Sequence, residues 1–204
     1  MSVHDTDSSL PDSESTSILE YIDRLTEDAS RLYLTMHVDK LSEVANLSYE
    51  LSCRHSYPKG QAHALIAKSW VLSCETKYDD SLALLNSALE IFLDLADAIG
   101  ISNAMKSIGN IYYHTGKITE ALDEFLGGYI TLLLAGEEEQ TLSLLNNVCN
   151  CYDILGEYSS ALDYADKYLI LARRLDDKRH IATALNLHGI LCCNFDDYPT
   201  ALEH

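Results

Sequence analysis

Proline and glycine are scarce in this chain of 204 residues, which contains three prolines and nine glycines. Both residue types interrupt regular secondary structure, and proline also lacks a backbone donor. Their scarcity indicates a mostly helical chain. Apolar residues make up 47% of the sequence, which is enough to give such helices a buried side.

Basic residues are few as well. Lysine and arginine together number 14 against 32 aspartates and glutamates, so the net charge is −18. A chain of this charge repels phosphate groups, which argues against a nucleic-acid partner and against docking on an anionic membrane. The charge permits a basic partner, although a solvated acidic outer face explains it more simply.

Long apolar runs are missing. No stretch approaches the ~18 apolar residues of a membrane span. The first residues, 1–17, are rich in Ser, Asp and Glu and lack the basic and apolar pattern of a signal peptide. We therefore expect a cytoplasmic protein without a membrane partner.

Cysteines are present but not in a metal-binding pattern. The six are Cys53, Cys74, Cys149, Cys151, Cys192 and Cys193. Neither close pair has zinc-ligand spacing, and two residues one or two apart on a helix point to different sides. We expect the thiols to be small buried hydrophobes, and we expect no metal and no other cofactor.

The chain does contain a pattern that repeats every 40 residues. The frame residues Tyr78, Ile118, Tyr158 and Tyr198 are each followed, three residues on, by a small residue and a leucine. A fixed period of this length indicates stacked supersecondary units. Apolar residues at helical spacing fill both halves of each period. The sequence therefore predicts an all-α fold, an α-α superhelix (solenoid) of about four and a half helix-turn-helix units.

The predicted boundaries follow from this period. A disordered tail over residues 1–16 precedes a single array over 17–204, and Ser17 with Glu20 forms a capping box at the first helix. The units span about 17–57, 58–97, 98–137, 138–177 and 178–204, the last incomplete.

The core of a unit can be predicted from the third one. A stripe on its first helix faces residues of the second helix: Met105, Ile108, Gly109 and Tyr112 against Ala121, Leu122 and Phe125. Gly109 allows the two backbones to approach closely. Gly127 and Gly128 interrupt the second helix at an expected cost of about 1 kcal/mol each.

These residues resemble the tetratricopeptide repeat, a unit of two paired helices joined by a Gly-containing turn. The first helix has an apolar residue followed by a small one, and then an aromatic residue. After the turn come Tyr, then Ala-Leu, then Phe. Residues 103–125 and 143–165 match best. The 40-residue unit exceeds the usual ~34 and is similar to the long-helix branch found in signalling scaffolds, motor light chains and bacterial peptide receptors.

Two departures stand out. Lys68 and His188 replace an apolar residue, and Tyr168 and Ala165 reverse the usual large and small positions, so that they could exchange volume.

The resemblance implies a function for the first helix of each unit, which lines a concave groove in this family. Asparagine recurs on the groove-facing stripe, and its amide both donates and accepts hydrogen bonds. A row of amides can pair with a peptide backbone, and long-unit members of the family use asparagines in this way. The predicted peptide-binding residues are Trp70, Asn103, Lys106, Asn110, Tyr113, His114, Asn146, Asn150 and Asn186. The implied protein is a peptide- or protein-binding module, the sensory or docking part of a longer signalling protein.

Other interpretations remain open. Asparagine also bridges neighbouring helices in repeat stacks. The stripes contain only one clear cation, Lys106, so the set with which chaperone-binding relatives hold a carboxylate is incomplete. The last unit stops after Ala201-Leu202, which suggests either a longer chain or self-association as a homodimer through the open unit or the convex face. No phosphate-binding loop or catalytic constellation is recognisable, so we do not expect an enzyme.

Overall fold

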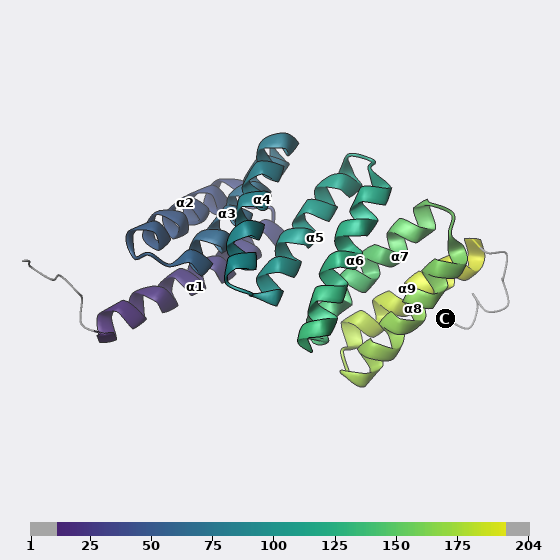
Figure 1. Cartoon of the computed structure of the whole chain (residues 1–204). Helices are drawn as coiled ribbons and strands as arrows, with labels where there is room; N and C mark the ends of the chain where they lie inside the picture. Colours follow the sequence, from purple (N-terminus) through teal and green to yellow (C-terminus); the bar gives the residue numbers. More distant parts are fainter. Residues whose placement is uncertain (1–11, 195–204) are drawn as a thin grey trace, which may run out of the picture. The chain divides into compact units, whose positions relative to one another are not determined.

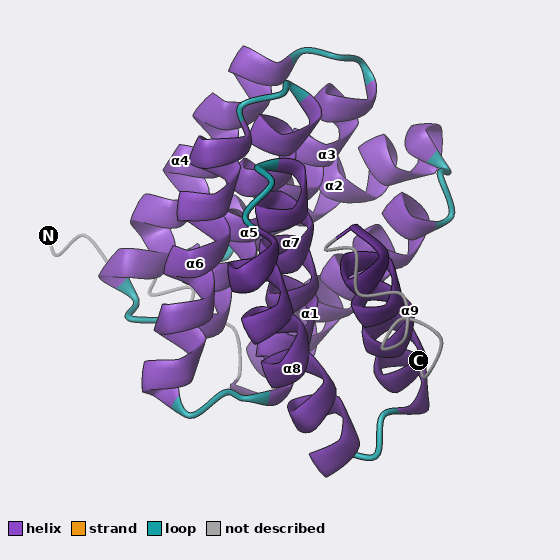
Figure 2. Cartoon of the chain, turned by 90° about the vertical axis from the view of Figure 1, so that its right-hand side faces the viewer, coloured by secondary structure: helices purple, strands orange, loops and turns teal. Residues whose placement is uncertain are grey.

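The computed structural model describes residues 12–194, which form α-helices joined by short turns (Figures 1 and 2). The helices are α1 (Asp12–Leu34), α2 (Val38–Arg54), α3 (Pro58–Cys74), α4 (Tyr78–Asp94), α5 (Ala98–His114), α6 (Ile118–Ala135), α7 (Leu142–Ile154), α8 (Tyr158–Arg174) and α9 (Lys178–Asn194). A short 3₁₀ helix, η1 (Glu139–Thr141), precedes α7. No strand occurs within residues 12–194. The predicted all-α solenoid of paired helices is confirmed.

The helix starts agree with the 40-residue frame, except at α1 and at α7, which begins at Leu142 after η1 instead of at the predicted unit boundary. Helix α1 begins at Asp12 and not at Ser17. Residues 12–16 show no apolar periodicity, so the spacing did not predict a helix there. The backbone hydrogen bonds of a helix do not depend on such periodicity. Residues 1–11 of the predicted tail lie outside the described residues, as do Tyr198 and the Ala201-Leu202 pair.

The contacts divide the chain into two compact parts, Met1–Leu84 and Leu85–His204. In the N-terminal part α1 packs on α2 and α3, and α2 packs on α3. The buried residues of this core include Ala29, Leu41, Ala45 and Ala67. Lys68, which replaces an apolar residue of the repeat, places its ammonium 4.8 Å from the centre of the Tyr49 ring. A cation–π contact therefore accommodates this charge.

In the C-terminal part each helix from α5 to α9 packs on the next. The predicted seam of the third unit is present: Ile108 and Phe125 are buried, and the Phe125 ring lies against the backbone at Gly109. Helix α6 continues through Gly127 and Gly128 without a break. The end of the Met105 side chain occupies the space that a Cβ at Gly127 would need.

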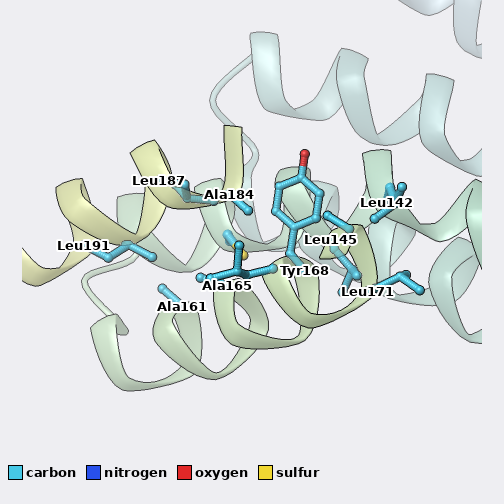
Figure 3. Packing of buried hydrophobic residues seen from close by; sticks show 12 residues of the cluster. Leu142, Leu145, Ala161, Ala165, Tyr168, Leu171, Ala184, Leu187 and Leu191 are labelled. Carbon is cyan, nitrogen blue, oxygen red and sulfur yellow. The ribbon is translucent and has the colours of Figure 1, made fainter. Parts of the chain in front are cut away.

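The fourth unit confirms the expected exchange of volume. Tyr168 and Ala165 lie in one buried cluster with residues of α7 and α9, and they are 1% and 0% exposed (Figure 3). The Tyr168 hydroxyl ends 2.6 Å from Nδ1 of His180 on α9. The large side chain thus fills the core from the position where the repeat normally has a small one.

The prediction that all six cysteines are buried is wrong for three of them. Cys53, Cys74 and Cys193 are exposed. Cys149 and Cys151 are buried in different clusters, as the two-residue spacing predicts. Burial raises the pKa of the Cys149 thiol to about 12, so this thiol is neutral and behaves as an apolar group.

The turns show a 20-residue period that only the structure reveals. One or two residues after the ends of helices α1 to α8, the backbone is left-handed, with φ between 49° and 79°. These residues are Met36, Ser56, Thr76, Ala96, Gly116, Gly136, Gly156 and Asp176. The next residue donates its N–H to a carbonyl five residues back, as Lys77 does to Leu72 at 2.9 Å. This is the Schellman motif, which satisfies the last carbonyls of each helix. Five of the eight positions lack glycine and carry backbone strain.

Replacing Thr76 by glycine should raise the free energy of unfolding by about 0.5–1 kcal/mol, because relief of left-handed strain exceeds the entropy that glycine adds to the unfolded chain. The matched control is Gly116→Ala, where φ is 79° and nothing lies within 4 Å of the new Cβ. This control should lose about 1 kcal/mol from backbone strain alone. Urea unfolding of both variants checks the pair, and a destabilised Thr76→Gly protein would contradict the explanation.

Candidate functional site

The first helices of the units in the C-terminal part, α5, α7 and α9, hold eight of the nine predicted peptide-binding residues. We call the surface that contains Asn103, Lys106, Asn110, Asn146 and Asn150 the amide face. All five side chains are half-buried, and they lie on α5 and α7. The fifth predicted asparagine, Asn186 on α9, is exposed.

The amides of this face have unused hydrogen-bonding capacity. Within residues 12–194, no hydrogen bond joins the side chains of Asn110, Asn146 or Asn150 to another residue. Water reaches these half-buried groups, so they carry no penalty in the free protein. An incoming backbone could replace that water at donor and acceptor alike.

The alternative role of asparagine is present at one position. Nδ2 of Asn194 on α9 donates to Oδ1 of Asp153 on α7 at 2.7 Å. This side chain bridges neighbouring first helices, whereas Asn110, Asn146 and Asn150 do not. The bridging role therefore applies to Asn194 and not to these three asparagines.

An open pocket of about 370 Å³ lies where α5, η1, α7 and α9 begin. It brings Asn103 and Lys106 together with Ser143 of the stripe on α7 and with residues that the stripes did not include: Ile99, Glu139, Gln140, Leu142, Asp177, Arg179 and His180. Burial lowers the pKa of Lys106. The sequence did not indicate Arg179 and His180 because they follow a turn, where the position of a side chain depends on the turn's conformation. Lys106 is consequently not the only cation of this region.

Tyr113 and His114 lie at the other end of α5. Their rings meet edge to face, with centroids 6.0 Å apart. Burial raises the pKa of Tyr113, and the charges of Cys151 and Asp153 raise it further. Because Cys151 and Asp153 belong to the last turn of α7, Tyr113 lies beside the end of that helix. His114 is exposed.

Trp70 belongs to the N-terminal part, and its ring stacks on Tyr33 of α1 with centroids 4.8 Å apart. It packs at the edge of the core formed by α1, α2 and α3. A side-chain contact therefore occupies one ring face of this predicted binding residue.

A second open pocket, of about 560 Å³, lies along α9. Its lining includes Leu185, Asn186, Ile190 and Asn194. Leu185 is half-buried and Ile190 is 45% exposed, so this side of α9 presents apolar surface beside its amides.

One polar cluster was not predicted. Nε2 of His188 lies 3.0 Å from Oδ1 of Asp166, and its Nδ1 lies 3.5 Å from the Cys192 sulfur. The spacing of His188 and Cys192 is visible in the sequence, but Asp166 comes from the neighbouring helix α8. The cluster is buried, since Cys192 is only 2% exposed. Because both ring nitrogens of His188 have polar neighbours, the repeat tolerates a histidine in place of an apolar residue. Within residues 12–194 no group of His, Cys, Asp and Glu side chains is arranged to hold a metal ion.

No family model matches the chain, and no curated protein matches it significantly. Solved structures do match. The TPR-like repeats of a putative kinesin light chain from Podosopora anserina superpose with a TM-score of 0.69 at 10% identity, covering 90% of each chain. Aspartyl phosphate phosphatase F from Bacillus subtilis gives 0.78 at 12% identity, covering 90% of this chain and 48% of its own. Bacillus thuringiensis PlcR, in complex with the peptide PapR7 and DNA, gives 0.68 at 15% identity, covering 90% and 69%.

These similarities establish a TPR-like fold, as the repeated residues predicted. The chain spans about half the length of the phosphatase F structure. None of the helices within residues 12–194 carries an apolar window long enough to cross a bilayer.

Proposed function

We propose that the C-terminal part binds an extended peptide, or an extended segment of a partner protein, along the amide face. The observation that supports this most directly is the set of half-buried amides on α5 and α7 that pair with no other residue within 12–194. Each amide offers one acceptor and two donors, which match the N–H and C=O groups of a backbone whatever its sequence. The aromatic ring of Tyr113 at one end offers apolar contact for a side chain.

The comparisons support binding as the class of function. The PlcR structure holds a peptide and DNA on a protein of the same fold. DNA is a poor ligand for this chain, because its net charge is −18 and phosphates would be repelled. We further propose that the chain acts as the sensory or docking part of a signalling or regulatory protein. Its role is to bind and not to catalyse.

Selection from a random peptide library, displayed at low copy number, tests the proposal without a known ligand. Binders of the wild-type chain should lose about tenfold in affinity for each of Asn110→Ala and Asn150→Ala, because each truncation removes backbone hydrogen bonds worth about 1 kcal/mol apiece. Helicity and the unfolding midpoint should stay nearly unchanged, since these amides stabilise no neighbouring helix.

The matched control uses asparagines on second helices. Asn46 on α2 and Asn86 on α4 are exposed, and their replacement by alanine should leave affinity unchanged. Equal losses in the amide-face and control variants, or unchanged affinity in both, would refute binding along this face.

Self-association is the alternative, and the exposed apolar side of α9 favours it. If Leu185 and Ile190 mediate pairing of two copies, the mass measured by light scattering should rise with concentration. Ile190→Asp should then give a monomer, while Asn110→Ala should not alter the mass.

A further inference from the structure

The second helix of the third unit, α6, exposes apolar side chains that the packing of the unit does not require. Ile130, Leu133 and Leu134 all lie on the side of α6 that faces away from the core, and Leu134 is 84% exposed. Forty residues earlier the repeat has Glu90 and Asp94 in place of Ile130 and Leu134. The repeat therefore tolerates charge at these places. Contiguous exposed apolar side chains of this kind mark an interaction surface.

Helix α8 lies beside α6 and runs in the same direction. The rings of Tyr129 on α6 and Tyr164 on α8 meet with their centroids 6.3 Å apart. Further along, Nη2 of Arg174 in the last turn of α8 lies 2.5 Å from Oε2 of Glu138, which follows the end of α6. The two helices therefore stay adjacent up to their C-terminal ends.

The exposed Ile170 of α8 extends the apolar surface of α6. The two contacts between the helices join residues 35 and 36 positions apart, which puts Ile170 level with Leu134. We call the surface formed by Ile130, Leu133, Leu134 and Ile170 the aliphatic patch. All four side chains are exposed.

Opposite charges flank the aliphatic patch at its two ends. Before the patch, the exposed charged residues of α6 are the acids Glu120 and Asp123. Beyond it, the last turn of α8 carries the exposed bases Arg173 and Arg174. Arg174 pairs with Glu138, whereas Arg173 forms no ion pair within residues 12–194. The order along this surface is therefore acid, aliphatic, base.

A surface with this order is complementary to itself. A two-fold axis through the patch sets the α6 helices of two copies antiparallel, so that each copy meets the same residues of the other. With the axis midway between Ile130 and Leu134, each of these side chains lies against the other in the partner copy. Arg173 of the partner copy then comes within about one helical turn of Asp123. The aliphatic side chains leave water while both signs of charge meet their opposites.

We propose that two copies of this chain pair through the aliphatic patch, with their α6 helices antiparallel. The net charge of −18 opposes this association only at long range, because salt at physiological strength screens exposed charges more than about 8 Å apart. The patch lies on second helices and the amide face on first helices, so pairing leaves the amide face open. The inference is thus independent of peptide binding, and it uses a different surface from pairing through α9.

Sedimentation equilibrium from micromolar to millimolar concentration tests the proposal at physiological salt. The average mass should rise from the 22.8 kDa of one chain toward twice that value. Leu134→Asp should raise the dissociation constant at least about 100-fold, because pairing would bury an unpaired carboxylate. Leu34→Asp is the matched control, since Leu34 is 79% exposed in the last turn of α1. This control should leave the dissociation constant unchanged.

Charge reversal tests the antiparallel arrangement. Asp123→Arg sets like charges against Arg173 of the partner copy, and Arg173→Asp does the same against Asp123. Each variant alone should lose at least about tenfold in affinity. An equimolar mixture of the two variants should regain nearly the affinity of the wild type, because both charge contacts of the mixed pair join opposite signs.

The outcomes decide between occupants of the patch. A wild-type mass of one chain at millimolar concentration would overturn the proposal and leave the patch to another protein. Association that persists in Leu134→Asp and disappears in Ile190→Asp would assign pairing to α9 instead. A mixture of charge variants that binds no better than either alone would refute the antiparallel pair. Far below the dissociation constant the chain is monomeric, so all these variants should unfold at the wild-type midpoint there.

Discussion

Replacing Tyr168 by alanine should lower the free energy of unfolding by about 3–5 kcal/mol, which would be among the largest effects of any single substitution in this chain. The side chain is 1% exposed and lies between α7, α8 and α9 (Figure 3). Its removal leaves a cavity and also deprives Nδ1 of His180 of its hydrogen-bonding partner. Urea unfolding followed by far-UV circular dichroism measures the loss. Ile170→Ala on the same helix, at a 66% exposed position, should change stability by less than about 0.5 kcal/mol.

The third unit suggests a compensating change. Phe125 and Gly128 stand 40 residues before Ala165 and Tyr168, with the large and small residues in the opposite order. Ala165→Phe alone should destabilise by about 1–3 kcal/mol through overpacking. Combined with Tyr168→Ala it should restore part of the loss, because the new ring fills the space that the old one left. Strictly additive losses in the double variant would show that the two positions do not share one volume.

Replacing Gly109 by alanine should destabilise the protein by about 1–3 kcal/mol, although the same change normally stabilises a helix. The added Cβ would lie 2.6 Å from Cε1 of Phe125, whose buried ring cannot move aside. Thermal or urea unfolding measures the sign directly.

Gly127→Ala is the matched comparison on the partner helix. The atom that its Cβ meets is the terminal methyl of Met105, a flexible side chain that can adopt another rotamer. This variant should be neutral or more stable by up to about 1 kcal/mol. If Gly109→Ala stabilises the protein, or if both substitutions destabilise it equally, the close approach of the two helices does not explain the glycine at position 109.

Much of the fold follows from local pattern. Helical periodicity and the 40-residue frame placed the starts of α4, α6 and α8 at or next to Tyr78, Ile118 and Tyr158, because the side of a helix that can be buried depends on spacing along one segment. The same argument predicted that Asn110, Asn146 and Asn150 lie on the groove-facing stripe of the first helices. It could not indicate the left-handed turns at Met36, Thr76 or Ala96, where the residue type opposes the conformation that helix packing imposes.

The candidate site depends more on the tertiary structure. The sequence by itself determined the repeat, the pairing of helices and which asparagines avoid the core. Only the folded chain decided that Asn194 pairs with Asp153, that Trp70 stacks on Tyr33, and that Lys106 shares a pocket with Arg179 and His180. The physical reason is distance along the chain. Periodicity reports the environment of a residue within its own helix, whereas partners 37 to 74 residues apart meet only when the packing angle and the turn between helices bring their side chains together.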